Sequence, residues 1–135
     1  MSIGVLLVTH PGIGETLLNN ACKLVGSCPL QITCMDIPLQ CDTLQLQQQV
    51  LDAAKRLDEG RGVLILTDAF GATPSNMACQ LTREMPANVV SGLNLPMLIR
   101  VFNYPGDDLQ ALTHKAAEGG IRGIQISRAG EEATE

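Results

Sequence analysis

Aromatic residues are scarce in this chain of 135 residues, which has no Trp, one Tyr and two Phe. Flavin-binding α/β domains hold their cofactor between aromatic rings, so this composition argues against that class. Long apolar runs are also missing, and none approaches the roughly 18 residues that a membrane-spanning helix needs. We therefore expect no bound cofactor and no membrane insertion.

Basic residues are few as well. The chain has nine Lys and Arg residues against 14 Asp and Glu residues, for a formal net charge of −5. The basic residues stand mostly singly along the sequence and form no cluster that could follow a phosphate backbone. This pattern excludes a typical nucleic-acid-binding domain.

The cysteines form no recognisable pattern. There are five of them, at Cys22, Cys28, Cys34, Cys41 and Cys79. Their odd number, the absence of a C-x-x-C pair and the absence of a secretory signal predict free thiols in a reducing cytoplasm rather than disulfides. The first three are evenly spaced but fall on different predicted elements, which favours buried or half-buried thiols over a metal site.

Apolar periodicity predicts four successive strand-and-helix units in one domain of residues 1–126. The expected strands lie at 5–9, 30–37, 63–67 and 89–93, and the expected helices begin near residues 14, 42, 74 and 96. Strands that alternate with helices form a parallel sheet with right-handed crossovers. We predict a doubly wound α/β fold of strand order 2-1-3-4 with helices on both faces.

The end of the chain has a different pattern. A further amphipathic helix is expected to stop at Gly119 and Gly120, and the segment from Arg122 to Ile126 alternates like a strand with one exposed face. We expect this last strand at an edge or a subunit boundary. Residues 127–135 have no large apolar side chain and three Glu residues, so a disordered acidic tail is predicted.

Two polar side chains follow the strands predicted to lie at the centre of the sheet. His10 ends the first strand and Asp68 follows the third. In the order 2-1-3-4 these strands are neighbours, and ligands of such sheets bind beyond the carboxyl ends of the strands where the order reverses. A carboxylate that holds one imidazole N–H orients the ring and stabilises the positive charge formed when the other nitrogen attacks an electrophile. We predict His10 and Asp68 as catalytic residues.

The loops beside these residues are suited to a phosphoryl group. Gly71, Ala72 and Thr73 precede a helix that has Pro74 in its first turn and Thr73 as its expected cap, and Gly12 opens a helix on the opposite wall. Phosphoryl transfer depends mainly on positioning and charge stabilisation and needs no metal ligand set here. Because the chain has neither a Walker A motif nor the third glycine of a dinucleotide fingerprint, a protein is the expected donor.

Other polar residues are given structural roles. His114 is expected at the surface of the last helix, and Asn76 and Asn94 are expected to bond to loop backbone. Phe70 is assigned either to loop packing or to contact with the phosphoryl group or a partner. A receiver domain is excluded because Thr9 and His10 stand where an acid pair would be required.

Three segments together resemble the IIA domain of the mannose-type bacterial phosphotransferase system. Thr9 and His10 close the first strand, residues 68–76 are similar to the motif D-x-x-G-G-[ST]-P-x-N, and residues 92–98 are similar to G-x-N-x-P-M-L. Two positions depart from the pattern: Ala72 stands where a second glycine is common, and Pro11 where glycine is frequent. These departures bear on rate and partner choice more than on the chemistry.

The resemblance implies a phosphohistidine carrier. His10 would take a phosphoryl group from the carrier protein HPr and pass it to a IIB domain for sugar uptake, with Asp68 as the partner of the ring. It also implies a homodimer in which the final strand is exchanged and runs antiparallel on the partner's sheet. The alternative is a free-standing regulatory module whose phosphorylation state controls binding to other proteins.

Overall fold

A four-stranded parallel sheet forms the centre of the protein, whose computed structural model describes residues 2–131. The strands are β1 (Gly4–Thr9), β2 (Ile32–Asp36), β3 (Val63–Thr67) and β4 (Ala87–Ser91). They are hydrogen-bonded in the order β2-β1-β3-β4, and every neighbouring pair is parallel. The predicted fold class and strand order are confirmed.

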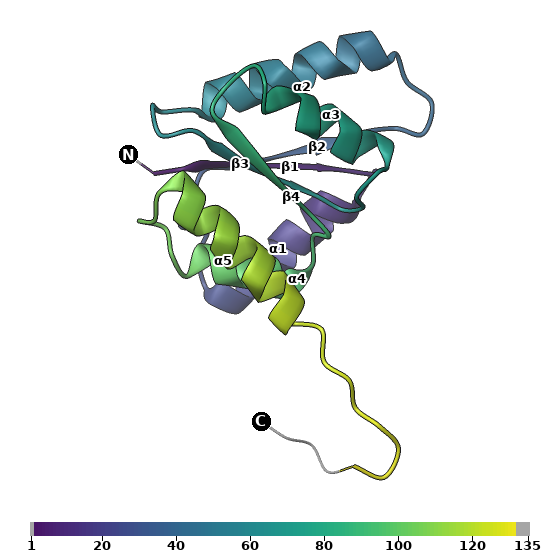
Figure 1. The fold of residues 1–135 in the computed structure, drawn as a ribbon, viewed down its shortest axis with the longest axis vertical. Coiled ribbons are helices and arrows are strands. Elements are labelled where there is room, and N and C mark those ends of the chain that lie inside the picture. Colours follow the sequence, from purple (N-terminus) through teal and green to yellow (C-terminus); the bar gives the residue numbers. More distant parts are fainter. Residues whose placement is uncertain (1, 132–135) are drawn as a thin grey trace.

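Helices cover both faces of the sheet. They are α1 (Ile13–Val25), α2 (Thr43–Leu57), α3 (Thr73–Leu81), α4 (Leu95–Phe102) and α5 (Leu109–Arg122). Figure 1 shows α2 and α3 on one face and α1, α4 and α5 on the other. Three helices begin at side-chain caps, because Asp42, Asn94 and Asp108 each accept a hydrogen bond from an amide of the first turn.

The two central strands are buried on both faces. All six residues of β1 and all five of β3 are buried. Along β1, Val5 and Leu7 pack with the core on the α1, α4 and α5 side, and Leu6 and Val8 pack with the core on the α2 and α3 side. Because a slip of one residue would exchange these two sets, burial on both faces fixes the register that brings the ends of β1 and β3 side by side.

The end of α5 differs from the sequence prediction. The helix does not stop at Gly119 and Gly120 but runs to Arg122. Both glycines are buried against α4, where a Cβ on Gly119 would lie 2.5 Å from the Cβ of Arg100. Their lack of a side chain serves close helix packing rather than helix termination.

No strand follows α5 in the described residues, so the single chain does not show the antiparallel edge strand predicted at 122–126, which was expected to pair with a partner copy. Gly123 to Glu131 leave the body without helix or strand, as the yellow end of the ribbon in Figure 1 shows. Ile124 and Ile126 are 71% and 72% exposed. An alternating segment needs a sheet edge to pair with, and the chain leads away from its own.

The structure describes only part of the predicted acidic tail. Residues 127–131 are exposed and irregular, and residues 132–135, the rest of the predicted acidic tail, lie outside the described residues. Among the residues that the structure describes, no helix is both long and apolar enough to cross a bilayer.

The prediction of five free thiols is also wrong. Cys22 and Cys28 form a disulfide with their Cα atoms 5.2 Å apart. Gly26 ends α1 in the left-handed conformation, with its amide bonded to the Cys22 carbonyl, and this turn brings Cys28 back to the last turn of the helix. Cys34, Cys41 and Cys79 are free thiols.

Candidate functional site

His10 and Asp68 meet at the carboxyl edge of the sheet. The ring Nδ1 of His10 lies 2.7 Å from Asp68 Oδ2, and the same oxygen accepts a hydrogen bond of 3.0 Å from the main-chain N–H of His10. The two residues are 58 positions apart in sequence, but they directly follow neighbouring strands. The predicted juxtaposition is confirmed.

The ionised carboxylate of Asp68 is favoured by its surroundings. Partial burial raises the pKa of Asp68, but the hydrogen bonds from the His10 main chain and ring, together with the charge of the imidazole, lower it below its ordinary value. Its side chain is only 9% exposed, whereas that of His10 is 32% exposed. The pair therefore consists of a sheltered anion and a ring that solvent can reach.

The contact with Asp68 occupies Nδ1 of His10 and leaves Nε2 as the free ring nitrogen. When Nδ1 carries the hydrogen and donates it to Asp68, the neutral imidazole keeps its lone pair on Nε2. The carboxylate holds the ring in this tautomer and stabilises the positive charge that follows attack by Nε2. The arrangement can act as an oriented nucleophile.

The loop between β3 and α3 presents free backbone amides beside the pair. Gly71 has a positive φ of 86°, and α3 begins without a side-chain cap. Within residues 2–131, the amides of Gly71 and Thr73 donate to no protein acceptor. The side-chain amide of Asn76 donates to the Gly71 carbonyl at 3.3 Å and holds the loop closed.

The predicted cap of α3 is wrong. Thr73 is the first residue of the helix, and Ala72 in extended conformation is its N-cap. An alanine has no oxygen to offer to the first-turn amides, so the positive end of this helix is open to an external anion.

Two amides at the start of α1 have acceptors in the loop between β1 and α1. Gly12 is the N-cap of α1, with a positive φ of 83° and no side-chain cap. The Ile13 amide donates to the His10 carbonyl at 3.4 Å, and the Gly14 amide donates to Thr9 Oγ1 at 3.0 Å. Of the four predicted phosphoryl-binding residues, Gly71, Ala72 and Thr73 lie on the loop between β3 and α3, and Gly12 lies on the loop between β1 and α1.

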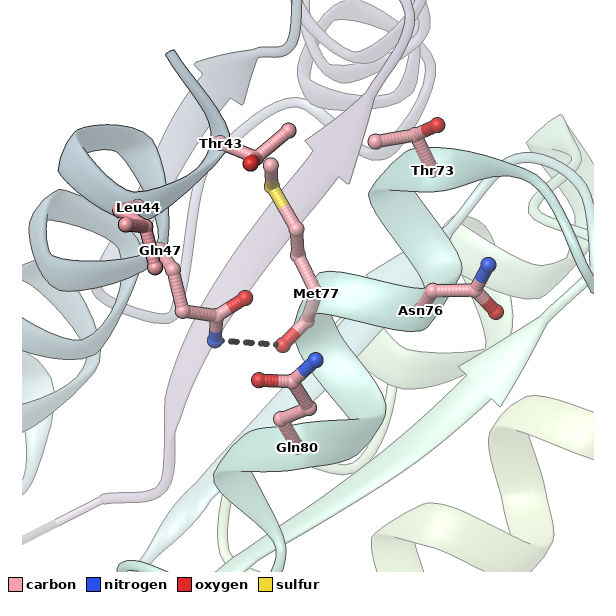
Figure 2. Close-up of a pocket in the computed structure, with 7 residues that line it drawn as sticks. All are labelled: Thr43, Leu44, Gln47, Thr73, Asn76, Met77 and Gln80. Carbon is pink, nitrogen blue, oxygen red and sulfur yellow. Dashed lines mark hydrogen bonds between the residues drawn. The ribbon is translucent and has the colours of Figure 1, made fainter.

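A small cavity lies between α2 and α3 next to the loop between β3 and α3. Its volume is about 240 Å³. Figure 2 shows Thr43, Leu44 and Gln47 of α2 opposite four residues of α3: Thr73, Asn76, Met77 and Gln80. The side-chain amide of Gln47 donates to the Met77 carbonyl at 3.0 Å and ties the two helices together. Sequence patterns gave no sign of this cavity, because its walls come from two helices 30 positions apart.

Exposed apolar side chains and acidic groups surround the site. Phe70, Leu39 and Leu44 are 85%, 89% and 83% exposed. The loops at this edge, residues 10–12, 37–42 and 68–72, have no Lys or Arg. Burial, followed by the charges of Glu15 and Asp36, raises the pKa of Cys34 on β2 to about 11.

The remaining polar residues lie as follows. Asn94 caps α4 through the Met97 amide and donates to the Gly120 carbonyl, so the backbone roles expected for Asn76 and Asn94 are confirmed. His114 is exposed on α5. No cluster of three or more metal-ligating side chains occurs in residues 2–131.

Fold and site together define a class: a doubly wound α/β domain with a histidine, oriented by an aspartate, at the point where the strand order reverses. Comparison with known families makes this specific. Residues 4–116 match the EIIA-man family, which is described as PTS system fructose IIA component. The chain belongs to this family, the mannose-family EIIA domains of the phosphotransferase system (PTS).

Individual relatives agree with this assignment. The chain is 29% identical over 133 residues to the PTS system mannose-specific EIIAB component of Escherichia coli K12, covering 96% of this chain and 41% of that protein. It therefore spans about two-fifths of the length of this curated relative.

Solved structures share the fold. The mannose/sorbose-specific IIA subunit of Enterococcus faecalis matches with a TM-score of 0.84 at 23% identity, over 98% of this chain and all of that one. The EIIA component of Streptococcus agalactiae matches with a TM-score of 0.78 at 21% identity, over 92% of this chain and 96% of that one.

Proposed function

We propose that this protein is a phosphohistidine carrier in sugar uptake, with His10 as the residue that is phosphorylated. The observation that carries the proposal is the 2.7 Å contact between His10 Nδ1 and Asp68 Oδ2. It leaves Nε2 as the nucleophile on a ring that is about one-third exposed. Family membership supports a phosphoryl group as the electrophile.

The reaction is a displacement at phosphorus. The Nε2 lone pair of His10 forms a bond to the phosphorus atom of the donor phosphohistidine, and the donor's P–N bond breaks in line. The electron pair of that bond returns to the donor imidazole. Asp68 accepts the Nδ1–H hydrogen bond and so stabilises the positive charge that the His10 ring gains. In the second transfer, a nucleophile on the acceptor attacks the phosphorus atom, and the P–N bond to His10 breaks.

The loop of Gly71, Ala72 and Thr73 would hold the phosphoryl oxygens. Its unoccupied amides and the uncapped N-terminus of α3 supply hydrogen-bond donors without a metal ion. Gly12, as the N-cap of α1, would close the opposite wall. Binding would therefore depend on the amides of Gly71 and Thr73, while the Ala72 amide donates to the Ala69 carbonyl at 3.3 Å and supports the turn.

HPr is the proposed donor, and a IIB domain or a regulatory target is the proposed acceptor. The exposed apolar side chains of Phe70, Leu39 and Leu44 suit contact with a protein surface rather than with a small donor. Because the surrounding loops lack Lys and Arg, cations that neutralise the phosphoryl group in transit would come from the partner.

We further propose that the carrier works in the cytoplasm as a homodimer, with residues 1–126 as its folded domain and 127–135 as an acidic tail. Within residues 2–131 the outer edge of β4 pairs with no strand. The exposed Ile124 and Ile126 suit a segment that pairs with this edge in a second copy.

Transfer from phosphoenolpyruvate through enzyme I and HPr tests the proposal. Wild-type protein should gain one phosphoryl group that is stable to base and labile to acid, and His10→Ala should gain none. His114→Ala is the matched control, because it removes the other histidine, which is exposed on α5, and should label like wild type. Equal labelling of His10→Ala, or an unlabelled wild type, would refute the carrier function.

A second assay separates transport from regulation. Phosphorylated protein is mixed with a mannose-family IIB domain, and loss of label from the carrier is followed. Rapid transfer supports the role in sugar uptake. Retention of the label would support the regulatory alternative, in which the phosphorylated state itself is recognised.

A further inference from the structure

Thr9, the residue before the histidine, lies in an unusual position for a hydroxyl group. Its side chain is fully buried at the end of β1, between the sheet and the first turn of α1. Its Oγ1 donates to the His10 carbonyl at 2.8 Å and accepts the Gly14 amide at 3.0 Å. One hydroxyl thus joins the turn at His10 to the helix that follows it.

Together with Asp68, this bridge holds the His10 residue on both sides. The main-chain N–H of His10 donates to Asp68 Oδ2, and its carbonyl accepts from Thr9. The ring is held by a third contact, again to Asp68. Two of these contacts fix the peptide groups on either side of the Cα atom, so they fix the direction in which the Cβ and the imidazole leave the backbone.

Without the Thr9 hydroxyl, the turn would lose its closest internal contacts. The His10 carbonyl would keep only the Ile13 amide at 3.4 Å, a long hydrogen bond, and the Gly14 amide would lose its acceptor. Gly14 also allows the close approach, since a Cβ there would lie 3.2 Å from Thr9 Oγ1. Glycine at position 14 therefore permits the hydrogen bond between its amide and Thr9 Oγ1.

We infer that Thr9 is a positioning residue for phosphoryl transfer, acting through the His10 carbonyl and the Gly14 amide. The inference rests on the proposed function. Asp68 sets the tautomer of the ring, and Thr9 sets the angle from which Nε2 approaches phosphorus. In-line displacement is sensitive to such an angle, because small displacements of a reacting group cost large factors in rate.

The first test uses no phosphoryl donor, so it can fail independently of the proposed function. Imidazole ¹⁵N spectra are recorded for wild type, Thr9→Val and Thr9→Ser. We expect the hydrogen-bonded Nδ1–H signal of His10 to weaken in Thr9→Val, as the ring leaves Asp68 part of the time, and to stay in Thr9→Ser. An unchanged signal in Thr9→Val would overturn the inference.

The second test measures transfer from phosphorylated HPr. Thr9→Val should lower the maximal rate about tenfold with KM for HPr changed less than twofold, and Thr9→Ser should keep at least half the wild-type rate. A loss confined to KM, or an equal loss in Thr9→Ser, would contradict positioning through the hydroxyl. If Thr9→Val does not fold, Thr9→Ala replaces it in both tests.

Thr113→Val provides the matched control. Thr113 Oγ1 also accepts one hydrogen bond and donates one, from Asn88 and to the Leu109 carbonyl, but it lies on α5 away from His10. Its loss should lower stability and leave transfer unchanged. If Thr113→Val slows transfer as much as Thr9→Val does, the effect of Thr9 is one of general stability and the inference fails.

Discussion

A single oxygen atom organises the site at the scale of residues. Asp68 Oδ2 accepts from both the main chain and the ring of His10, while Oδ1 accepts the Ala69 amide. The Ala69 amide therefore holds one oxygen of the carboxylate, while the other oxygen binds His10. Such a supported acid keeps its orientation when the ring becomes charged, which is the condition for electrostatic stabilisation without reorganisation.

Replacement of Asp68 by Asn should retain the fold and slow transfer. An amide oxygen can still accept the Nδ1–H hydrogen bond, but it cannot stabilise the positive charge of the attacking ring, so we expect a rate about 10- to 100-fold lower. Rapid-quench measurement of transfer from phosphorylated HPr checks the rate. A wild-type rate in this variant would remove Asp68 from the mechanism.

The lowered pKa of Asp68 predicts a pH dependence of stability. Because the folded state binds this proton less tightly than the unfolded state, the stabilisation is fully present above the unfolded pKa of about 3.9. It is lost as the pH falls through the lower, folded-state pKa. Urea unfolding of wild type and Asp68→Asn should show a gap at pH 7 that shrinks below about pH 4. A constant gap down to pH 2.5 would contradict this assignment.

Sequence alone predicted the central pair of the site but not its supports. His10 and Asp68 could be paired because apolar strands mark their positions and the strand order makes those strands neighbours. Thr9 could not be given a role, since its contacts depend on how the turn brings the Gly14 amide back to it. The N-terminus of α3 was predicted as an anion site, but its cap was misassigned: Thr73 is the first residue of the helix and Ala72 is the N-cap.

At the scale of elements, the packing of α4 against α5 depends on glycine. A Cβ on Gly119 would lie 2.5 Å from Arg100 Cβ and 2.7 Å from Arg100 Cγ. Both contacts involve atoms close to the backbone of α4, which cannot move aside like the end of a long side chain. The two helices are therefore closer than any other residue at 119 would allow.

Gly119→Ala should destabilise the protein. The overlap with α4 outweighs the better helix propensity of alanine, and we expect the free energy of unfolding to fall by about 2 kcal/mol. Gly106→Ala is the control, because a Cβ there meets nothing within 4 Å, and it should stay within about 0.5 kcal/mol of wild type. Urea titration of both variants measures the free energy of unfolding. Equal values for the two variants would show that α4 and α5 can move apart to accept the methyl group.

Element types were more predictable than element ends. Periodicity located all four strands and five helices of the described chain, because each apolar stripe faces a core. The end of α5 was misplaced because Gly119 and Gly120 resemble a stop signal, whereas their neighbours on α4 give them another role. The Cys22–Cys28 disulfide was missed because spacing alone does not show that the chain turns back after α1.

At the scale of the whole molecule, the proposed dimer makes a prediction about the C-terminal segment. Wild-type protein should have the mass of two chains by light scattering, and a variant that ends at Gly123 should have the mass of one. A variant that ends at Ser127 keeps Ile124 and Ile126 and should remain dimeric. A dimeric Gly123 variant would show that the segment does not hold the two copies together.

The separation of His10 and Asp68 along the chain also has a consequence for biosynthesis. A nascent chain that ends before Val63 already has the imidazole but lacks both the strand and the acid that complete the pair. If His10 carries a phosphoryl group as proposed, fragments and misassembled copies would be poor acceptors. On the proposed function, His10 would become a competent acceptor only after β3 and Asp68 have folded beside it.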